Sequence, residues 1–297
     1  MDESNSGSTA VDRDGSTEDV VEDRTPTLAV RKEQWIAAEI RQRVLEHNLN
    51  AIVIFIGPTG FGKSYSALRL GELVDPKFKL SHLAFSAENF LDLVNGGDIE
   101  PGQVIVWDEV GLGMPAREWQ SIFNKAVGYI LQSFRFKRIC LIMTVPDQGF
   151  IDAQARRLFH YLFECVSIDR TLNRVVTKPF MVQHSPRFEK DYPKYPRIKR
   201  KTGTVKMASV SFAMPSKDLR ESYEDKRKLY MDAYYQDLRD SFVIGAQGSD
   251  VPAWAWRALV ELSVGRNQAE LAGILQISRV WANKLLAKAK AALKNAR

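Results

Sequence analysis

Residues 57–64 have the types and the spacing that bind phosphate groups. They read GPTGFGKS and match the pattern G-x-x-x-x-G-K-[ST]. Glycines let the backbone of such a loop point successive N–H groups at phosphate oxygens, and the helix that follows adds the positive end of its dipole. In this pattern Lys63 reaches the β- and γ-phosphates of a nucleotide, and the hydroxyl of Ser64 coordinates Mg²⁺. We therefore predict that ATP and Mg²⁺ bind at Gly57, Pro58, Thr59, Gly60, Phe61, Gly62, Lys63, Ser64 and Tyr65.

The segments on either side of this loop have the character that the motif requires. Residues 51–56 are apolar and β-branched, as in a buried strand, and residues 65–74 combine good helix formers with apolar residues at helical spacing. Strand, glycine-rich loop and helix thus follow in the order that the motif needs. The alternative is a glycine-rich turn before a helix that binds no ligand.

A second motif, at residues 104–109, ends in two acids. The sequence VIVWDE has an apolar run typical of a buried strand. In nucleotide hydrolases an acid in the position of Asp108 holds Mg²⁺, directly or through water, and an acid in the position of Glu109 polarises the attacking water. Binding alone would not need the second acid, so the pair favours hydrolysis. The alternative is a buried strand that meets two acids at its exposed end.

Other polar residues are candidates for contact with the γ-phosphate. Residues 138–143 predict a buried strand, and Thr144 follows at its tip, where hydrolases of this kind place a γ-phosphate sensor. The alternative is a threonine that ends a strand at a turn. An arginine finger acting across a subunit boundary has four candidates near the same edge of the sheet. They are Arg135, Arg138, Arg156 and Arg157.

Strands and helices alternate through this part of the chain. Residues 82–85 predict a short strand, residues 87–94 a helix, and residues 119–134 a long helix with one continuous apolar face. Such alternation implies a mostly parallel sheet covered by helices. The predicted fold class is therefore α/β, a P-loop NTPase, with a small all-α domain at the C-terminus.

Composition narrows the class of protein. The chain has 297 residues, of which 45% are hydrophobic, which is enough for one substantial core and a small second domain. We find no apolar run of the length of a membrane span and no signal-peptide pattern, so the expected location is the cytoplasm, or the host cytoplasm or virion if the source is viral. The two cysteines and four scattered histidines predict neither a disulfide framework nor a metal site.

Charge is distributed unevenly, although the net charge is only +6. Residues 1–30 hold eight acids against two basic residues, with few large apolar side chains, and predict a disordered acidic tail. Residues 187–230 carry thirteen Lys or Arg against six acids, and residues 252–297 carry eight against two. Two basic zones indicate a nucleic-acid surface. The alternative is a basic face that is merely solvated.

The predicted domains follow from these patterns. The core covers residues 31–185, and a basic β/α extension covers residues 186–244, with a helix at residues 216–240. Residues 245–251 predict a linker, and residues 252–297 a helix-turn-helix domain.

In the C-terminal domain the helices are expected at residues 254–263, 267–275 and 279–293. Ser278 caps the third helix, whose first residues would enter a DNA major groove. The predicted DNA-binding residues are Ser278, Arg279, Trp281, Asn283 and Lys284. The alternative is a basic three-helix module that docks a protein instead of DNA.

The order of these motifs across residues 50–185 resembles the HerA/FtsK superfamily of DNA-pumping ATPases. GPTGFGKS, VIVWDE, SFRFKRICLIMT and PDQGFIDAQARRLF are most similar to its zonular occludens toxin-like and viral packaging branches. The resemblance implies nucleotide and metal roles for Lys63, Ser64, Asp108 and Glu109, and further roles for Thr144 and Arg135. Two departures stand out. The sensor is commonly glutamine, whereas this chain has Thr144, with Gln148 four positions later. The filamentous-phage members are membrane-anchored, whereas no span is found here.

These observations predict an Mg²⁺-dependent ATPase that engages DNA, most specifically a translocation or genome-packaging motor that works as a homo-oligomeric ring without inserting into a membrane. An alternative of another class is a nucleotide-gated DNA-binding regulator or replication initiator that uses the helix-turn-helix. A small-molecule kinase would need an acceptor site and a lid, for which the sequence shows no pattern.

Overall fold

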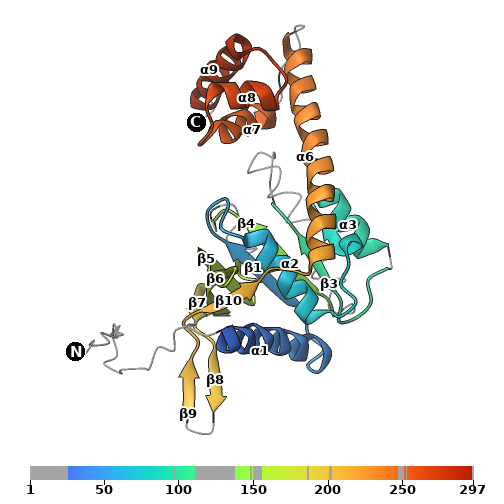
Figure 1. The fold of residues 1–297 in the computed structure, drawn as a ribbon, viewed down its shortest axis with the longest axis vertical. Helices are drawn as coiled ribbons and strands as arrows, with labels where there is room; N and C mark the ends of the chain where they lie inside the picture. The colour runs from blue at the N-terminus through green and yellow to red at the C-terminus, as the bar shows by residue number, and fades with distance from the viewer. Residues whose placement is uncertain are drawn as a thin grey trace, which may run out of the picture.

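The structure, a computed structural model, describes residues 26–96, 98–110, 138–147, 149, 156–185, 187–200, 203–246, 251 and 253–295. A central sheet dominates this part of the chain (Figure 1), with strand order β10-β6-β5-β1-β4-β3-β2 and β7 paired to β6. Its strands are β1 (Ala51–Ile56), β2 (Leu83–Ala84), β3 (Val104–Trp107), β4 (Cys140–Val145), β5 (Tyr161–Asp169), β6 (Arg174–Ser185), β7 (Lys190–Lys194) and β10 (Val210–Ala213). A separate hairpin consists of β8 (Arg197–Arg200) and β9 (Gly203–Lys206).

The centre of the sheet is parallel, as the alternating sequence pattern predicts. β1 pairs in parallel with β4 and β5, and β3 pairs in parallel with β4 and β2. The strands β6, β7 and β10 extend one side in antiparallel pairing. Because parallel strands run in the same direction, the residues that follow β1, β3 and β4 lie at one edge of the sheet.

Helices cover both faces of the parallel strands. Side chains of β1 alternate between the faces: Val53 and Phe55 join one buried cluster, and Ile52 and Ile54 join the other. The helices α1 (Pro26–Leu45) and α2 (Lys63–Val74) contribute to the first cluster, and α3 (Ala87–Asn95) contributes to the second. The α/β fold with a mostly parallel central sheet between helices is thus confirmed.

Two helices differ from their predicted limits. The helix α1 begins at Pro26, inside the segment predicted as a disordered tail, because proline suits the first turn of a helix and later side chains such as Ile36 are buried. The helix α6 (Lys217–Ala246) runs beyond residue 240 and takes in two residues of the predicted linker. The reason is apolar burial, since Phe242 is only 2% exposed.

The strands β9 and β10 follow one another closely in sequence and are separated by a short segment that contains the buried Met207. The predicted helix at residues 119–134 lies outside the described residues. In the described part of the chain, no helix has the length and apolar character needed to cross a membrane.

Three helices form the C-terminal unit: α7 (Ala253–Ser263), α8 (Gln268–Ile274) and α9 (Arg279–Asn295). Their caps explain their limits. Asn267 and Glu270 make a capping box at the start of α8, and Ser278 Oγ accepts a hydrogen bond from Trp281 N at the start of α9. Leu238 and Phe242 of α6 belong to the same buried cluster as Leu259 and Leu271.

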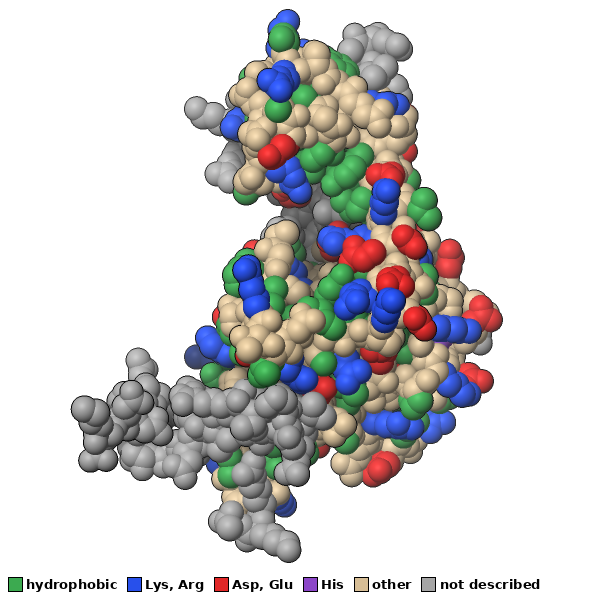
Figure 2. Space-filling view, viewed as in Figure 1, with side chains coloured by type: hydrophobic (Ala, Val, Ile, Leu, Met, Phe, Trp, Pro, Cys, Tyr) green, Lys and Arg blue, Asp and Glu red, His purple; other side chains and the backbone are tan. Residues whose placement is uncertain are grey.

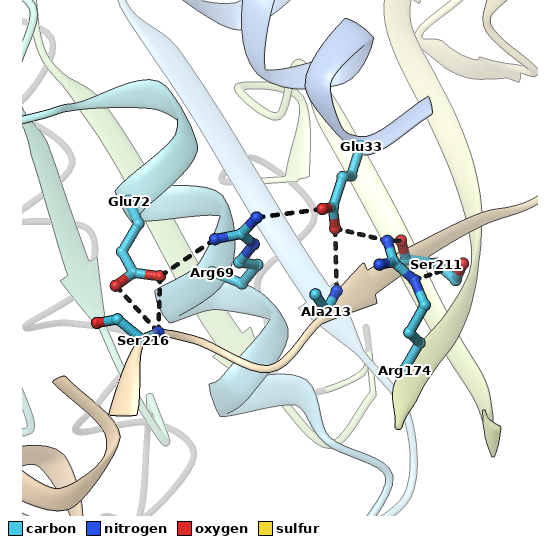
Figure 3. Close-up of polar contacts among 7 residues, drawn as sticks. All are labelled: Glu33, Arg69, Glu72, Arg174, Ser211, Ala213 and Ser216. Carbon is cyan, nitrogen blue, oxygen red and sulfur yellow. Dashed lines mark hydrogen bonds and ion pairs between the residues drawn. The ribbon is translucent and has the colours of Figure 1, made fainter. Parts of the chain in front are cut away.

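A buried carboxylate joins several elements of the core (Figure 3). Glu33 of α1 is 0% exposed and lies 2.8 Å from Arg174 of β6 and 3.2 Å from Arg69 of α2. It also accepts a hydrogen bond from Ala213 N of β10. Arg69 in turn lies 3.6 Å from Glu72, which accepts from the backbone N–H of Ser216 just before α6. This network fixes α1, α2, β6, β10 and the start of α6 relative to one another.

We expect Glu33→Ala to lower the free energy of unfolding by about 3–5 kcal/mol, because it leaves the Arg174 guanidinium buried without a counter-charge. The measurement is urea unfolding followed by circular dichroism. The matched control is Glu100→Ala, since Glu100 pairs with Lys77 at 3.0 Å with both side chains more than half exposed. That change should cost less than about 1 kcal/mol. Equal effects of the two substitutions would contradict the assignment.

Candidate nucleotide site

The loop between β1 and α2 has a backbone that only glycine adopts readily. The φ angles of Gly57, Gly60 and Gly62 are 143°, 83° and 79°. Space adds a second restriction at two of them: a Cβ at Gly62 would lie 2.4 Å from Val175 Cγ2, and one at Gly57 would lie 2.7 Å from Cys165 O. The predicted phosphate-binding loop is therefore pressed against β5 and β6.

The first turn of α2 fits an anion. Gly62 is its N-cap and has no side chain to accept from the backbone N–H groups of that turn. Lys63 Nζ donates to Gly57 O at 2.8 Å and to Pro58 O at 2.9 Å, across the mouth of the loop. Burial lowers the pKa of Lys63, while the nearby Cys165, Asp108 and Glu109 oppose the decrease.

The other loop residues differ in exposure. Pro58, Thr59 and Gly60 are exposed, whereas Phe61 packs partly against the core. Tyr65 lies on the first turn of α2 and donates to Glu224 Oε1 of α6 at 2.7 Å. Burial, together with this hydrogen bond, raises the pKa of Tyr65 to about 12.

The acidic pair lies at the same edge of the sheet as the loop. Asp108, directly after β3, is 0% exposed, and both of its oxygens have partners. Its Oδ1 accepts from Thr144 Oγ1 at 2.6 Å, and its Oδ2 accepts from the hydroxyl of Tyr223 on α6 at 2.6 Å. Burial raises the pKa of Tyr223, and the nearby side chain of Ser64 opposes this increase. Hence the predicted metal ligands Ser64 and Asp108 share one neighbour.

Thr144 connects the two acids. The strand β4, on which it lies, is paired with both β1 and β3. Its Oγ1 donates to Asp108 and accepts from Glu109 N at 2.9 Å. Glu109 has a φ of 50°, which a residue with a side chain seldom adopts. The hydrogen bond from Glu109 N stabilises this turn and directs the chain away from the strand.

Glu109 is held by a residue from outside the core motifs. Arg227 of α6 donates from Nη2 to Glu109 Oε1. Burial raises the pKa of Glu109, as does the adjacent Asp108, while Arg227 and Lys63 lower it. Tyr223 and Arg227 were not predicted as site residues. The sequence indicates a helix over this region, but it contains no local signal that the helix lies against a strand more than 100 residues earlier.

Three of the four candidate arginine fingers are not near this edge. Arg138 precedes β4, and Arg156 and Arg157 precede β5, so these three lie toward the amino ends of strands whose carboxyl ends face the site. The expected placement at the same edge is wrong for them, because the edge depends on strand direction. Arg135 and Gln148 lie outside the described residues.

The predicted DNA-contacting residues lie at the start of α9. Ser278, Arg279, Asn283 and Lys284 are exposed, whereas Trp281 is half-buried against the core of the C-terminal unit. The large ring of Trp281 covers apolar side chains of the bundle. A nearby cavity of about 580 Å³ has the cationic side chains Arg266, Arg279 and Lys290 in its wall.

The donor set fits a nucleotide with Mg²⁺. An uncapped helix start and a lysine suit phosphate oxygens, and the hydroxyl of Ser64 and the buried carboxylate of Asp108 are oxygen donors that suit a hard cation. Loop, acids and Thr144 come together at the carboxyl ends of β1, β3 and β4, where open α/β sheets place ligands.

We expect Thr144→Val to lower the free energy of unfolding by about 1–3 kcal/mol, because it keeps the side-chain shape but removes a hydrogen bond to the buried Asp108 carboxylate. Thr144→Ser, which retains the hydroxyl, is the control and should lose less than half as much. Thermal and urea unfolding of both variants measure this. A valine variant as stable as the serine variant would show that the bridge is not a stabilising contact.

Comparison with known proteins adds little to this geometry. No protein-family model matches the chain, and no curated protein matches it. Among solved structures, the N-terminal domain of zonular occludens toxin from Neisseria meningitidis is similar over 49% of this chain and 93% of its own, with 12% sequence identity and a TM-score of 0.30. A TM-score this low does not establish a common fold.

Proposed function

We propose that this protein is an Mg²⁺-dependent ATPase that engages DNA. The observation that supports the ATPase most is the meeting of three features at one sheet edge: the glycine loop before α2, the buried Asp108, and Glu109 beside it. A phosphate loop alone would support binding. The second acid, turned out of the strand by its unusual φ, supports hydrolysis.

Each side chain has a role in this proposal. The N–H groups of the loop and Lys63 bind the phosphates, and Ser64 with Asp108 would hold Mg²⁺. When bound, Mg²⁺ neutralises charge that develops on the transferred phosphoryl group. Glu109 orients and deprotonates the attacking water. Thr144 holds both acids in register and lies where a γ-phosphate sensor is expected.

The DNA part of the proposal rests on charge and exposure in the C-terminal unit. Arg279, Asn283 and Lys284 are exposed on the first two turns of α9, and the adjacent cavity is lined by further cations. Phosphate contacts by Lys and Arg supply most of the affinity of such surfaces. We therefore propose that α8 and α9 act as a helix-turn-helix that holds the DNA.

The specific form that we propose is DNA translocation or genome packaging by a homo-oligomeric ring, with Arg135 as the candidate finger across the subunit boundary. The support for this form is the order of motifs along residues 50–185. A nucleotide-gated DNA-binding regulator or initiator is the second candidate. The contacts of α6 with both acids and with the C-terminal unit favour it, because they suit a protein whose DNA affinity depends on the bound nucleotide.

The decisive experiment measures ATP hydrolysis by the full chain with and without long double-stranded DNA. We expect DNA to stimulate turnover, and we expect Glu109→Gln to lower turnover by about 100-fold or more, because it removes the general base. Binding of a fluorescent ATP analogue to the same variant should be retained.

The outcomes separate the candidates. Stimulation by long DNA that is absent in the glutamine variant would support the motor, and the number of subunits in the complex would be counted next. Indifference to DNA together with a monomeric state would refute the motor. Slow turnover with tight, nucleotide-dependent binding to particular DNA sequences would favour the regulator.

A further inference from the structure

The helix α6 contacts both site acids with side chains one turn apart. The hydroxyl of Tyr223, a residue that is 0% exposed, donates to Asp108, and four positions later Arg227 donates to Glu109. Residues four apart lie on the same face of a helix. One face of α6 therefore lies against the acid-bearing turn after β3.

These contacts restrain the groups that hydrolysis would need. A general base needs a carboxylate oxygen directed at water, and the ion pair holds an oxygen of Glu109 against Arg227. Asp108 is restrained in the same way, since Thr144 and Tyr223 use both of its oxygens. In this arrangement α6 occupies carboxylate oxygens that water and Mg²⁺ would otherwise contact, so it opposes hydrolysis.

Arg227 also has a free donor. Its Nε is buried and has no hydrogen-bond partner among the described residues. A buried unpaired donor is costly. An additional acceptor close by, such as a phosphate oxygen, would relieve this cost if Arg227 moved toward it. The Arg227 side chain is thus less completely satisfied than the Thr144 hydroxyl, which both donates and accepts.

Several other contacts hold α6 in this position. Lys226 Nζ donates to Leu83 O at 2.8 Å and to Leu80 O at 3.2 Å. The Tyr230 ring stacks on Phe85 with centroids 5.0 Å apart. Together with the bond between Tyr65 and Glu224, they attach the first half of α6 to α2, to β2 and to the segments beside β2. The acid contacts belong to a continuous interface.

The far half of α6 is part of the C-terminal unit. Leu238 and Phe242 are buried in its core, and Arg239 donates to Gln276 in the turn between α8 and α9. At about 1.5 Å per residue, α6 carries the chain roughly 17 Å from Arg227 to Leu238 without a break. Figure 1 shows this helix as the rod that joins the two parts, and Figure 2 shows charged side chains of both signs along it, beside a hollow between the parts.

We propose that α6 regulates the site: it inhibits hydrolysis through the Arg227–Glu109 contact, and DNA bound by the C-terminal unit releases Glu109 by shifting α6. This inference rests on the proposed ATPase function. Coupling through a shared element is reciprocal, so bound nucleotide changes the affinity for DNA by the same factor as DNA changes the affinity for nucleotide.

The test compares Arg227→Ala with Lys228→Ala, which removes the same charge from the exposed next residue of α6. Arg227→Ala should raise DNA-free ATP turnover by about five-fold or more, the lower range of known couplings. The ratio of turnover with long double-stranded DNA to turnover without it should fall toward one. Binding of a fluorescent ATP analogue should stay within about two-fold, and the control should match the wild type in all three.

Two results would overturn the proposal. Turnover of Arg227→Ala that falls by tenfold or more with binding retained would make Arg227 a catalytic residue instead. If the turnover of Arg227→Ala rises but the ratio of turnover with DNA to turnover without DNA is unchanged, DNA does not act on the site through α6. If the wild type neither binds the analogue nor hydrolyses ATP, the proposed function fails, and that result is distinct from both.

A second measurement uses the wild-type chain, so its result does not depend on whether a variant folds. Hydrogen exchange of the wild-type chain reports on α6 directly, and we expect long double-stranded DNA to lower protection at residues 223–230. The Mg²⁺ complex of a non-hydrolysable ATP analogue alone should leave these residues protected. Unchanged protection in the presence of DNA would contradict the proposed release of α6. Tyr223→Phe, which keeps the ring but removes the hydroxyl, should raise DNA-free turnover in the same direction as Arg227→Ala.

Discussion

The buried carboxylate of Asp108 is the constraint on which the rest of the structure depends. A charge without access to water is tolerated only where hydrogen bonds replace the lost solvent. Here they come from β4 through Thr144 and from α6 through Tyr223. The backbone N–H of Asp108 is bonded to Ala84 O of β2. The side chain of Asp108 thus requires β4 and a helix distant in sequence to meet at the end of β3.

Glu33 is a second buried carboxylate whose charge is compensated by partners from several elements. Its partners on α2, β6 and β10 position the segment that enters α6, since Glu72 accepts from Ser216 N. The start of α6 is therefore held through Glu72, and Tyr223 on its second turn contacts the other buried carboxylate, Asp108. A helix held at two such points has few ways to move, and a tilt about its anchored start would change the distance between Arg227 and Glu109.

Local patterns predicted much of the parallel core, and the reason is physical. Glycine spacing, β-branched runs and helix caps act within a few residues, so the loop, β3 and the start of α9 are close to their expected places. Side-chain contacts between distant segments leave no such trace. The roles of Tyr223 and Arg227, and the edge on which Arg138 lies, depend on strand order and helix packing, which one sequence does not encode locally. Charge patterning indicated a basic surface but not the contact of Arg227 with Glu109.

The continuity of α6 bears most directly on mechanism. A flexible linker at residues 245–251 alone would let the C-terminal unit bind DNA without consequence for the site, because a random coil transmits little force or orientation. Leu238 and Phe242 are buried, so the C-terminal unit is attached to α6 itself, before residues 245–251. The C-terminal unit is packed on the same rod that holds Glu109. A rigid helix can relay a change to the site only if one of its contacts there can be replaced. Arg227 is a candidate for that contact, because its buried Nε has no partner among the described residues.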